Sequence, residues 1–244
     1  LCLLANPTLP SLGVGDPTTL AQRYAGGGWL SDQAALRALE GISSTGDREA
    51  VGAALRAVYR PWLERTAQEF QAAVLERGLD TAPPETVAEG GCLLFVDGLR
   101  LDLGERLRGW LEADRLKVDL SWRFAAQPSV TSTAKYAVSP IAGRLLPGLE
   151  FTPRNGKVQM NVNVLRRLLE AEGYTPLLEG DLGSGQGRAW TECGDLDSLG
   201  HAGGAKLPSQ LERALEEVHE RIQALLGAGW QEVRVITDHG WLLL

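Results

Sequence analysis

The stretch that decides the fold is Gly91-Cys-Leu-Leu-Phe-Val-Asp97-Gly98. Its apolar residues are continuous instead of alternating with polar ones, so a strand formed by them must be covered on both faces. A run of this kind, ending on an acid and a glycine, is typical of a parallel sheet that lies between two layers of helices. We therefore predict a buried strand here.

A second strand is predicted near the end of the sequence, in Glu232-Val-Arg-Val-Ile-Thr-Asp-His-Gly240. Its short β-branched run stops on Asp238 and His239, whose side chains are both able to bind metal ions. Ligands usually bind at the carboxyl ends of strands in open α/β sheets. Asp-His-Gly can equally form a plain turn, so a functional interpretation depends on matching residues elsewhere in the chain.

Between these two strands the sequence alternates helical and extended patterns. Apolar residues recur at helical spacing over 101–112, 161–172 and 207–226. Strands are predicted over 118–124, where apolar and polar residues alternate, and over 188–193, and a loop is predicted over 194–204. This order of elements predicts an α/β fold, with a mostly parallel sheet flanked by helices.

A helical segment is predicted in front of this core. Residues 1–85 are expected to form an α-helical segment and residues 86–244 the sheet-forming core, with the pair Pro83-Pro84 near the boundary. The simpler interpretation of the helical segment is an extension that packs on the core. The alternative is a region that docks a partner or acts as a lid.

Local signals place the elements of this helical segment. Its Pro- and Gly-rich beginning is expected to be irregular, with one helical turn near 20–24. Ser31 or Asp32 is expected to cap the next helix. A longer helix is predicted over about 48–77, and Pro61 is expected to break or kink it.

Composition limits the classes of protein. With 244 residues, 44% of them hydrophobic, the chain can bury a sizeable core. No apolar run reaches the roughly 18 residues of a membrane-spanning helix, so no membrane partner is expected. Three widely spaced cysteines do not indicate a disulfide framework, which favours a cytoplasmic location. The net charge of −7 argues against a generally nucleic-acid-binding surface, though not against a local basic groove.

Four polar clusters follow predicted strands or lie in loops. They are Asp97, Thr131 at the predicted start of a helix, the segment Asp197-Ser-Leu-Gly-His201, and the pair Asp238-His239. Carboxylate oxygens and imidazole nitrogens are the ligands of zinc sites that keep a coordination position open for catalysis. Two such ions about 3.5–4 Å apart would hold the attacking and leaving oxygens of a phosphoryl displacement. A metal-activated threonine hydroxyl at a helix N-terminus would be the nucleophile.

In this order, the clusters resemble the alkaline phosphatase superfamily, and within it the PglZ family of BREX and phage-growth-limitation defence systems. The resemblance rests on Phe95-Val-Asp97-Gly98-Leu-Arg100, Pro128-Ser-Val-Thr131, Asp197-Ser-Leu-Gly-His201 and Thr237-Asp-His-Gly240, and covers about residues 90–244. The segment 197–201 is also similar to the corresponding segment of nucleotide pyrophosphatase/phosphodiesterases. The resemblance implies an alkaline-phosphatase-like core in residues 86–244.

The resemblance also implies a function and a set of site residues. It implies a phosphoester hydrolase with two divalent metal ions, zinc being expected and manganese the alternative. Asp97, Thr131, Asp238 and His239 would bind one ion, and Asp197 and His201 the other. Thr131 would attack phosphorus to form a phosphothreonine, which water then releases. Lys135 or Arg100 would stabilise the phosphate oxygens.

The sequence lacks one part that the resemblance calls for. The second metal site normally has a further histidine after the Asp-His-Gly strand, and the chain ends at Leu244 before supplying it. Because Leu1 is not an initiator methionine and the chain stops directly after a strand, we expect a piece of a longer protein with an incomplete core. Because the further histidine is missing, we expect the second metal site to bind its ion weakly. His219, among glutamates on a predicted helix, is expected to be solvated.

The expected partners follow from the same resemblance. They are a phosphate ester, with a nucleic-acid diester preferred, and other subunits of a BREX-type defence complex. The non-catalytic alternative keeps the same fold as a scaffold or assembly subunit of that complex, and residues 1–80 would then be its docking surface.

Several residue assignments have alternatives. Asp195 is a near-equivalent of Asp197, and Thr131 would be an N-cap if Thr133 carried the reactive hydroxyl. Lys135 would otherwise be a surface lysine, and Arg100 a structural or solvated residue. The motif Ser132-Thr-Ala-Lys135 also matches penicillin-recognising serine enzymes, but the later Lys-Thr-Gly and Ser-x-Asn elements of that family are absent from the sequence.

Overall fold

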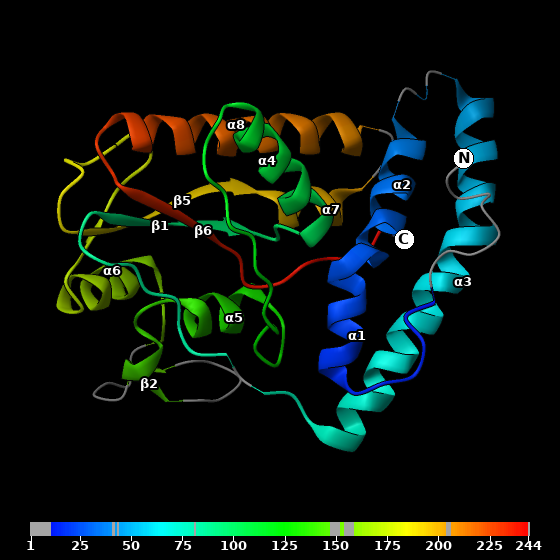
Figure 1. The fold of residues 1–244 in the computed structure, drawn as a ribbon, viewed down its shortest axis with the longest axis horizontal. Helices are drawn as coiled ribbons and strands as arrows, with labels where there is room; N and C mark the ends of the chain where they lie inside the picture. The colour runs from blue at the N-terminus through cyan, green and yellow to red at the C-terminus, as the bar shows by residue number, and fades with distance from the viewer. Residues whose placement is uncertain are drawn as a thin grey trace.

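The computed structural model describes residues 11–40, 42, 44–80, 82–146, 152–153, 159–203 and 206–243. It has a parallel four-stranded sheet with helices on both faces and a group of N-terminal helices beside it (Figure 1). The predicted α/β fold class, with a preceding helical segment, is confirmed. Of the described helices, none is both long enough and apolar enough to cross a membrane.

The sheet has the strand order β4-β5-β1-β6, and every neighbouring pair is parallel. Its strands are β1 (Gly91–Asp97), β4 (Tyr174–Pro176), β5 (Arg188–Asp195) and β6 (Glu232–Ile236). The apolar residues of β1 are at most 2% exposed, as expected of a central strand covered on both faces. A separate antiparallel pair joins β2 (Leu145–Leu146) to β3 (Thr152–Pro153).

Two helical layers cover the sheet (Figure 1). One layer contains α4 (Leu101–Ala113), α7 (Leu196–Ala202) and α8 (Leu207–Gly227). The other layer contains α5 (Thr131–Val138) and α6 (Val162–Ala171), and the 3-10 turn η2 (Ala142–Arg144) lies between these two helices in the sequence. Because side chains alternate along a strand, β1 contributes to both layers. Leu94 and Val96 join the core with α4 and α8, and Leu93 and Phe95 join the core with α5 and α6.

The N-terminal helices pack beside the end of the sheet rather than on its faces (Figure 1). They are α1 (Pro17–Arg23), a π-helical turn η1 (Tyr24–Gly28), α2 (Trp29–Leu39) and α3 (Thr45–Arg77). α2 packs against α3, α4 and α8, and its Leu36 is part of the α4–α8 core. The helical segment is therefore joined to the core through α2, while the predicted division at residue 85 stays a prediction.

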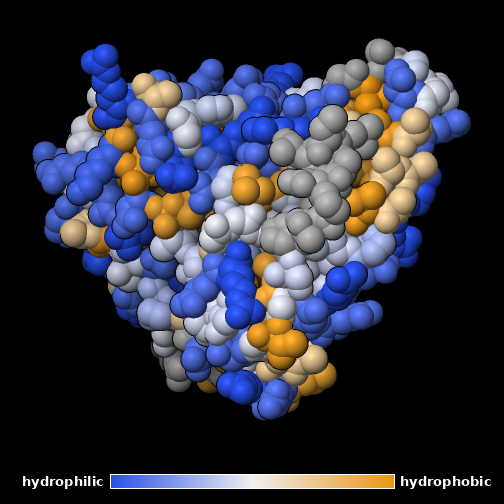
Figure 2. Space-filling view, turned by 45° about the vertical axis from the view of Figure 1, so that its right-hand side comes forward, coloured by the Kyte–Doolittle hydropathy of each residue, from blue (hydrophilic) through white to orange (hydrophobic). Residues whose placement is uncertain are grey.

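The outer surface of the molecule offers no broad apolar face in the view of Figure 2. Among the residues drawn in colour there, hydrophobic side chains form small groups separated by hydrophilic ones. The exposed large hydrophobic residues are correspondingly distributed over several elements, for example Val58 and Leu75 on α3 and Leu178 after β4. Scattered exposed apolar residues of this kind are normal for folded proteins.

Two predictions in the core are wrong. Residues 118–124 form no strand; they run as an irregular segment, with Val118 packed on the α4–α8 core and Arg123 bonded to Glu85 and the Ala82 carbonyl. Apolar and polar residues alternate here because one side of the segment packs on the core, although the segment forms no strand. The predicted loop over 194–204 contains α7, which the Asp195 carboxylate caps by accepting a hydrogen bond from the Ser198 amide.

Three predictions in the helical segment also need correction. Helical structure begins earlier than expected, because Asp16 caps α1 at Pro17. Ser31 and Asp32 do not cap α2 but lie inside it, since the helix starts at Trp29. Of the break or kink predicted at Pro61, the break does not occur, because α3 continues through this residue.

Candidate functional site

The candidate site lies where three neighbouring parallel strands end. β5, β1 and β6 are adjacent and parallel, so their carboxyl ends meet at one edge of the sheet. Asp97 is the last residue of β1, Asp197 lies at the start of α7 just after β5, and Asp238 and His239 follow β6. The sheet order thus brings together three acids and a histidine that are far apart in the sequence.

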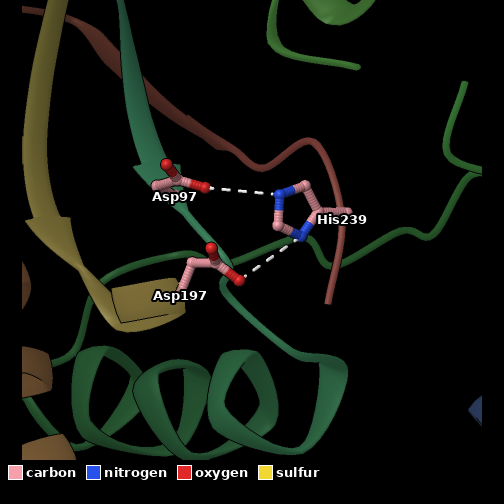
Figure 3. Close-up of side chains that lie close together, drawn as sticks. All are labelled: Asp97, Asp197 and His239. Carbon is pink, nitrogen blue, oxygen red and sulfur yellow. Dashed lines mark ion pairs between the residues drawn. The ribbon is translucent and has the colours of Figure 1, made fainter. Parts of the chain in front are cut away.

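Three of these residues form a compact group of metal-ligand atoms. One side-chain ligand atom each from Asp97, Asp197 and His239 lie within 4.8 Å of one another. His239 lies between the two acids, with Nε2 3.6 Å from Asp97 Oδ1 and Nδ1 3.8 Å from Asp197 Oδ1 (Figure 3). All three side chains are partly buried, so the group is partly shielded from solvent at the strand ends.

Gly98 allows the exit of β1 to pass close beside α7. Its φ of +69° is in the left-handed region, and a Cβ at this position would lie 2.6 Å from the Asp197 backbone nitrogen. Any side chain here would be strained and would collide with the residue that carries one of the acids. The glycine after Asp97 is therefore what allows Asp97 and Asp197 to approach one another.

Thr131 joins this group from the other side of the sheet. It is the first residue of α5, and its hydroxyl lies 3.2 and 3.3 Å from the two carboxylate oxygens of Asp97 and 3.0 Å from His239 Nε2. Val130 occupies the N-cap position, so Thr131 is not the cap. Thr133 is only 1% exposed and belongs to the buried face of α5. Of the two threonines, Thr131 is thus the one placed at the acids.

Asp238 is the most deeply buried acid of the site. It is 4% exposed; its Oδ1 accepts a hydrogen bond from the His239 amide, and its Oδ2 lies 3.7 Å from His239 Nε2. Burial raises the pKa of Asp238 to about 6, against the attraction of His239 and with the help of repulsion from Asp97. Burial likewise raises the pKa of Asp97, and the nearby Asp197 adds to that increase.

Two carboxylate oxygens of the site lack hydrogen-bond partners. Asp197 Oδ1 and Asp238 Oδ2 are buried and accept no hydrogen bond from any residue that the structure describes. A buried, unsatisfied carboxylate oxygen is costly, and the cost grows when several acids are close together. The site therefore has the electrostatic character of a cation site.

The remaining predicted metal ligand lies at the rim. The His201 side chain is 75% exposed, with Nε2 3.4 Å from Asp197 Oδ1. Asp195 is used as the cap of α7, so Asp197 rather than Asp195 faces His239. Asp197 was assigned by the resemblance to the second ion; the structure places it with the residues expected for the first. His219, expected to be solvated, pairs with Asp114 at 2.7 Å.

The two basic residues expected to bind phosphate are both engaged in ion pairs. Lys135 lies 2.7 Å from Glu192 and 4.7 Å above the Phe95 ring. Arg100 is only 6% exposed and contacts Asp32 at 3.2 Å and Asp102 at 2.9 Å. Arg100 is thus buried in an ion-pair cluster, as its structural alternative requires, while phosphate binding by Lys135 or Arg100 stays a prediction.

Sequence analysis missed Trp241, which follows the Asp-His-Gly triplet. Its Nε1 donates a hydrogen bond to the Gly98 carbonyl at 3.1 Å. Its ring lies so close to Gly200 that a Cβ there would be 2.2 Å away. The available signal was the glycine inside the motif 197–201, whose lack of a side chain indicates a close contact.

In comparisons with known proteins, no family model matches the chain, and no curated protein matches it.

Proposed function

We propose that this chain is a metal-dependent phosphoester hydrolase in which Thr131 is the nucleophile. The observation that carries the proposal is the position of the Thr131 hydroxyl, 3.2 Å from Asp97 and 3.0 Å from His239, at a site of three acids. A threonine hydroxyl is unreactive at neutral pH unless a base or a cation activates it. A base, Asp97, is present in this arrangement, and the acids of the site would hold a cation.

The residues present fit a divalent cation. Two buried carboxylate oxygens without hydrogen-bond partners, on Asp197 and Asp238, are what a cation would neutralise. Three carboxylates, an imidazole and a hydroxyl are a donor set that suits Zn²⁺ or Mn²⁺. Asp97, Asp197 and His239 would hold the ion, with Thr131 and Asp238 beside it. A second ion at Asp197 and His201 remains part of the proposal.

When bound, such an ion supplies Lewis-acid chemistry: it lowers the pKa of a coordinated hydroxyl and offsets phosphate charge. The chain's own residues do the rest. Asp97 holds the Thr131 proton in a hydrogen bond, and its carboxylate, which has two oxygens, is placed to take that proton as the hydroxyl oxygen attacks phosphorus. The Oγ1–phosphorus bond forms while the ester bond to the leaving group breaks. Attack of water on the phosphothreonine then restores Thr131 and releases phosphate from a monoester substrate, or a phosphomonoester from a diester substrate.

The substrate class is part of the proposal and rests on resemblance. The segment 197–201 is similar to that of phosphodiesterases, which favours a diester, and a nucleic-acid diester within a BREX-type defence complex is the preferred case. The acidic site and the chain's net charge of −7 mean that any phosphate ester would depend on bound cations to approach. The dependence of catalysis on added metal is therefore expected to be steep.

A scaffold role is the second candidate, and one observation favours it. Neither basic residue expected to bind phosphate offers a free charge: Lys135 is paired with Glu192, and Arg100 is buried between two acids. A protein that keeps the fold of a phosphoesterase while serving as an assembly subunit would not need such a charge.

Hydrolysis of bis(p-nitrophenyl) phosphate and of p-nitrophenyl phosphate, with Zn²⁺ or Mn²⁺ added, separates the two candidates. Thr131→Ala should reduce the rate by about 10³-fold or more, because it removes the nucleophile. Ser132→Ala is the matched control, since it removes an exposed hydroxyl from the same helix turn, and should retain the rate within about threefold. Equal rates for wild type, Thr131→Ala and a no-protein blank would reject the hydrolase and favour the scaffold.

A further inference from the structure

We propose that Asp32, in the N-terminal helical segment, is a positioning residue for the candidate metal site. It acts through Arg100 and Trp241 on the turns that carry the metal-ligand residues. This inference deepens the proposed function and rests on it, because it assumes that the group at the strand ends binds a cation. On this proposal, α2 helps to position the metal-ligand residues and is more than an extension packed on the core.

The first link is a buried ion-pair cluster between α2 and the turn after β1. Arg100 Nη2 lies 3.2 Å from Asp32 Oδ1, and Arg100 Nε lies 2.9 Å from Asp102 Oδ1. Asp32 also accepts hydrogen bonds from the hydroxyls of Tyr24 at 2.6 Å and Tyr59 at 2.5 Å. With Asp32 5% and Arg100 6% exposed, this cluster holds the guanidinium in one place.

The second link runs from Arg100 to Trp241. The guanidinium carbon lies 4.5 Å from the centre of the Trp241 ring, within the range of a cation–π interaction. Arginine suits this position because its planar group can bind two carboxylates and stack on an aromatic ring at the same time. Trp241 is two residues beyond His239, so its position constrains the end of the chain that carries Asp238 and His239.

The third link runs from Trp241 to the two other ligand-bearing segments. Its Nε1 bonds to the Gly98 carbonyl, directly after Asp97, and its ring contacts Gly200 inside α7, which carries Asp197. A further bond, from the Leu99 amide to Thr237 Oγ1 at 3.0 Å, ties the exits of β1 and β6 together. The segments that follow β1, β5 and β6 therefore meet around the Trp241 indole. Asp32 pairs with Arg100, whose guanidinium stacks on that indole.

This arrangement predicts an effect on metal affinity at a distance. Residues that orient metal ligands without touching the metal typically change its affinity by about 10- to 100-fold when they are replaced. Since Asp32 acts through two intermediate residues, we expect the lower end of that range, about tenfold. A purely structural role would lower global stability and leave metal affinity unchanged below the unfolding temperature.

The test compares Asp32→Asn and Arg100→Lys with Glu40→Gln. Glu40 follows α2 and pairs with Arg106 of α4 at 3.5 Å, partly exposed, so the control breaks an ion pair between the same two elements away from Trp241. Arg100→Lys keeps the charge but loses the planar group. Tyr59→Phe, which removes one hydrogen bond to Asp32, is the mild variant for the case in which Asp32→Asn does not fold.

Two readouts are measured on each folded protein. The first is Zn²⁺ affinity, by competition with a chromophoric chelator. The second is hydrogen–deuterium exchange without metal, in peptides covering 97–99 and 196–201, with a peptide of α6 as internal reference. We expect about tenfold weaker zinc binding for Asp32→Asn and Arg100→Lys and faster exchange in those two peptides alone, with both readouts at wild-type values in Glu40→Gln.

The outcomes separate this inference from the proposed function. Zinc binding by the wild type with unchanged affinity and exchange in Asp32→Asn and Arg100→Lys overturns the positioning role and leaves the site intact. Faster exchange throughout the chain, including α6, also overturns it, because that result describes a merely structural role. No zinc binding by the wild type overturns the proposed function, and the exchange result alone then decides whether Asp32 holds these segments.

Discussion

In the part of the chain that the structure describes, acidic side chains are buried in two places, and the two are built differently. Beside α2, Asp32 and Asp102 share the guanidinium of Arg100, and Asp32 accepts hydrogen bonds from two tyrosines. At the strand ends, Asp97, Asp197 and Asp238 lie beside His239 and the Thr131 hydroxyl, and Asp197 also lies beside the exposed His201. Two of their oxygens accept no hydrogen bond from a described residue.

This difference teaches how to distinguish a structural charge cluster from a ligand site. In the Asp32–Arg100–Asp102 cluster, the protein supplies the compensating positive charge itself. In the strand-end cluster, burial raises carboxyl pKa values and the protein supplies no comparable cation. Buried charges are normally paired or coordinate metals. The strand-end acids have only histidine ion-pair partners among the described residues, so they are the group expected to bind a ligand.

The largest expected effect is on metal binding at the strand ends. Asp97→Asn should weaken zinc affinity by about 100-fold or more, since it removes a ligand that also orients Thr131. Isothermal titration of the metal-free protein measures this. Asp114→Asn is the matched control, because Asp114 pairs with His219 away from the strand ends, and a similar loss of affinity in both variants would mean that zinc binds nonspecifically to surface acids.

The second effect concerns stability and belongs to the structural cluster. Arg100→Met should lower the free energy of unfolding by roughly 3–5 kcal/mol, because it leaves Asp32 and Asp102 buried without a cation. Lys135→Met breaks a more accessible pair with Glu192 and should cost about 1 kcal/mol or less. Urea denaturation checks both values; equal losses would show that Arg100 is not the cation that holds this cluster together.

The third effect is a pH dependence of the metal-free protein. The pKa of Asp238 is 3.8 when unfolded and about 6 when folded, so between these values the folded state binds a proton that the unfolded state does not. The stability contributed by protonated Asp238 is therefore complete below about pH 4 and is lost as the pH rises through about 6, by on the order of 3 kcal/mol. Urea denaturation from pH 4 to 7 should show this loss of unfolding free energy for wild type relative to Asp238→Asn. If the unfolding free energies of the two proteins change equally with pH, ionisation of Asp238 does not destabilise the folded state.

Added metal should remove that penalty. At a free zinc concentration about 100 times the dissociation constant, the free energy of unfolding should rise by about 2.7 kcal/mol. Thermal denaturation with and without zinc measures the shift for wild type and for Asp97→Asn, in which we expect little or none. An equal shift in both proteins would place the stabilising ion somewhere other than the strand ends.

The smallest effect again concerns the structural cluster. Tyr24→Phe removes one of the two tyrosine hydrogen bonds to Asp32 and should lower the free energy of unfolding by about 1 kcal/mol. Urea denaturation is sensitive enough to measure this. An unchanged free energy of unfolding would mean that Tyr59 and Arg100 are sufficient partners for the Asp32 carboxylate. The connection from α2 to the site would then run through these two residues and not through Tyr24.

Much of the fold and site could be predicted because the signals were local. The continuous apolar run of β1 and the β-branched run of β6 indicate strands by composition alone. The rule that ligands gather at the carboxyl ends of parallel strands then brings Asp97 and Asp238 to one edge. The irregular segment 118–124 was mistaken for a strand because one-sided packing on a helix layer produces the same alternation as a sheet face.

The rest depended on contacts between distant parts of the chain. Nothing near Arg100 in the sequence indicates that its charge is taken by Asp32 from α2, so its position beside a ligand motif suggested phosphate binding instead. Similarly, the role of Trp241 depends on Gly98 and Gly200, which reach it from two other segments. Patterns in a single sequence show which face of a helix or strand must be buried. They do not show which distant residue will pack against that face.

The most direct test of the account is anomalous diffraction from crystals of this protein soaked in zinc. The account predicts a zinc peak at the ends of β1, β5 and β6, about 2.0–2.2 Å from carboxylate oxygens of Asp97 and Asp197 and from a ring nitrogen of His239. An empty strand-end group in crystals that bind zinc elsewhere would contradict it, and the carboxylate oxygens without hydrogen-bond partners would then have no ligand to explain them.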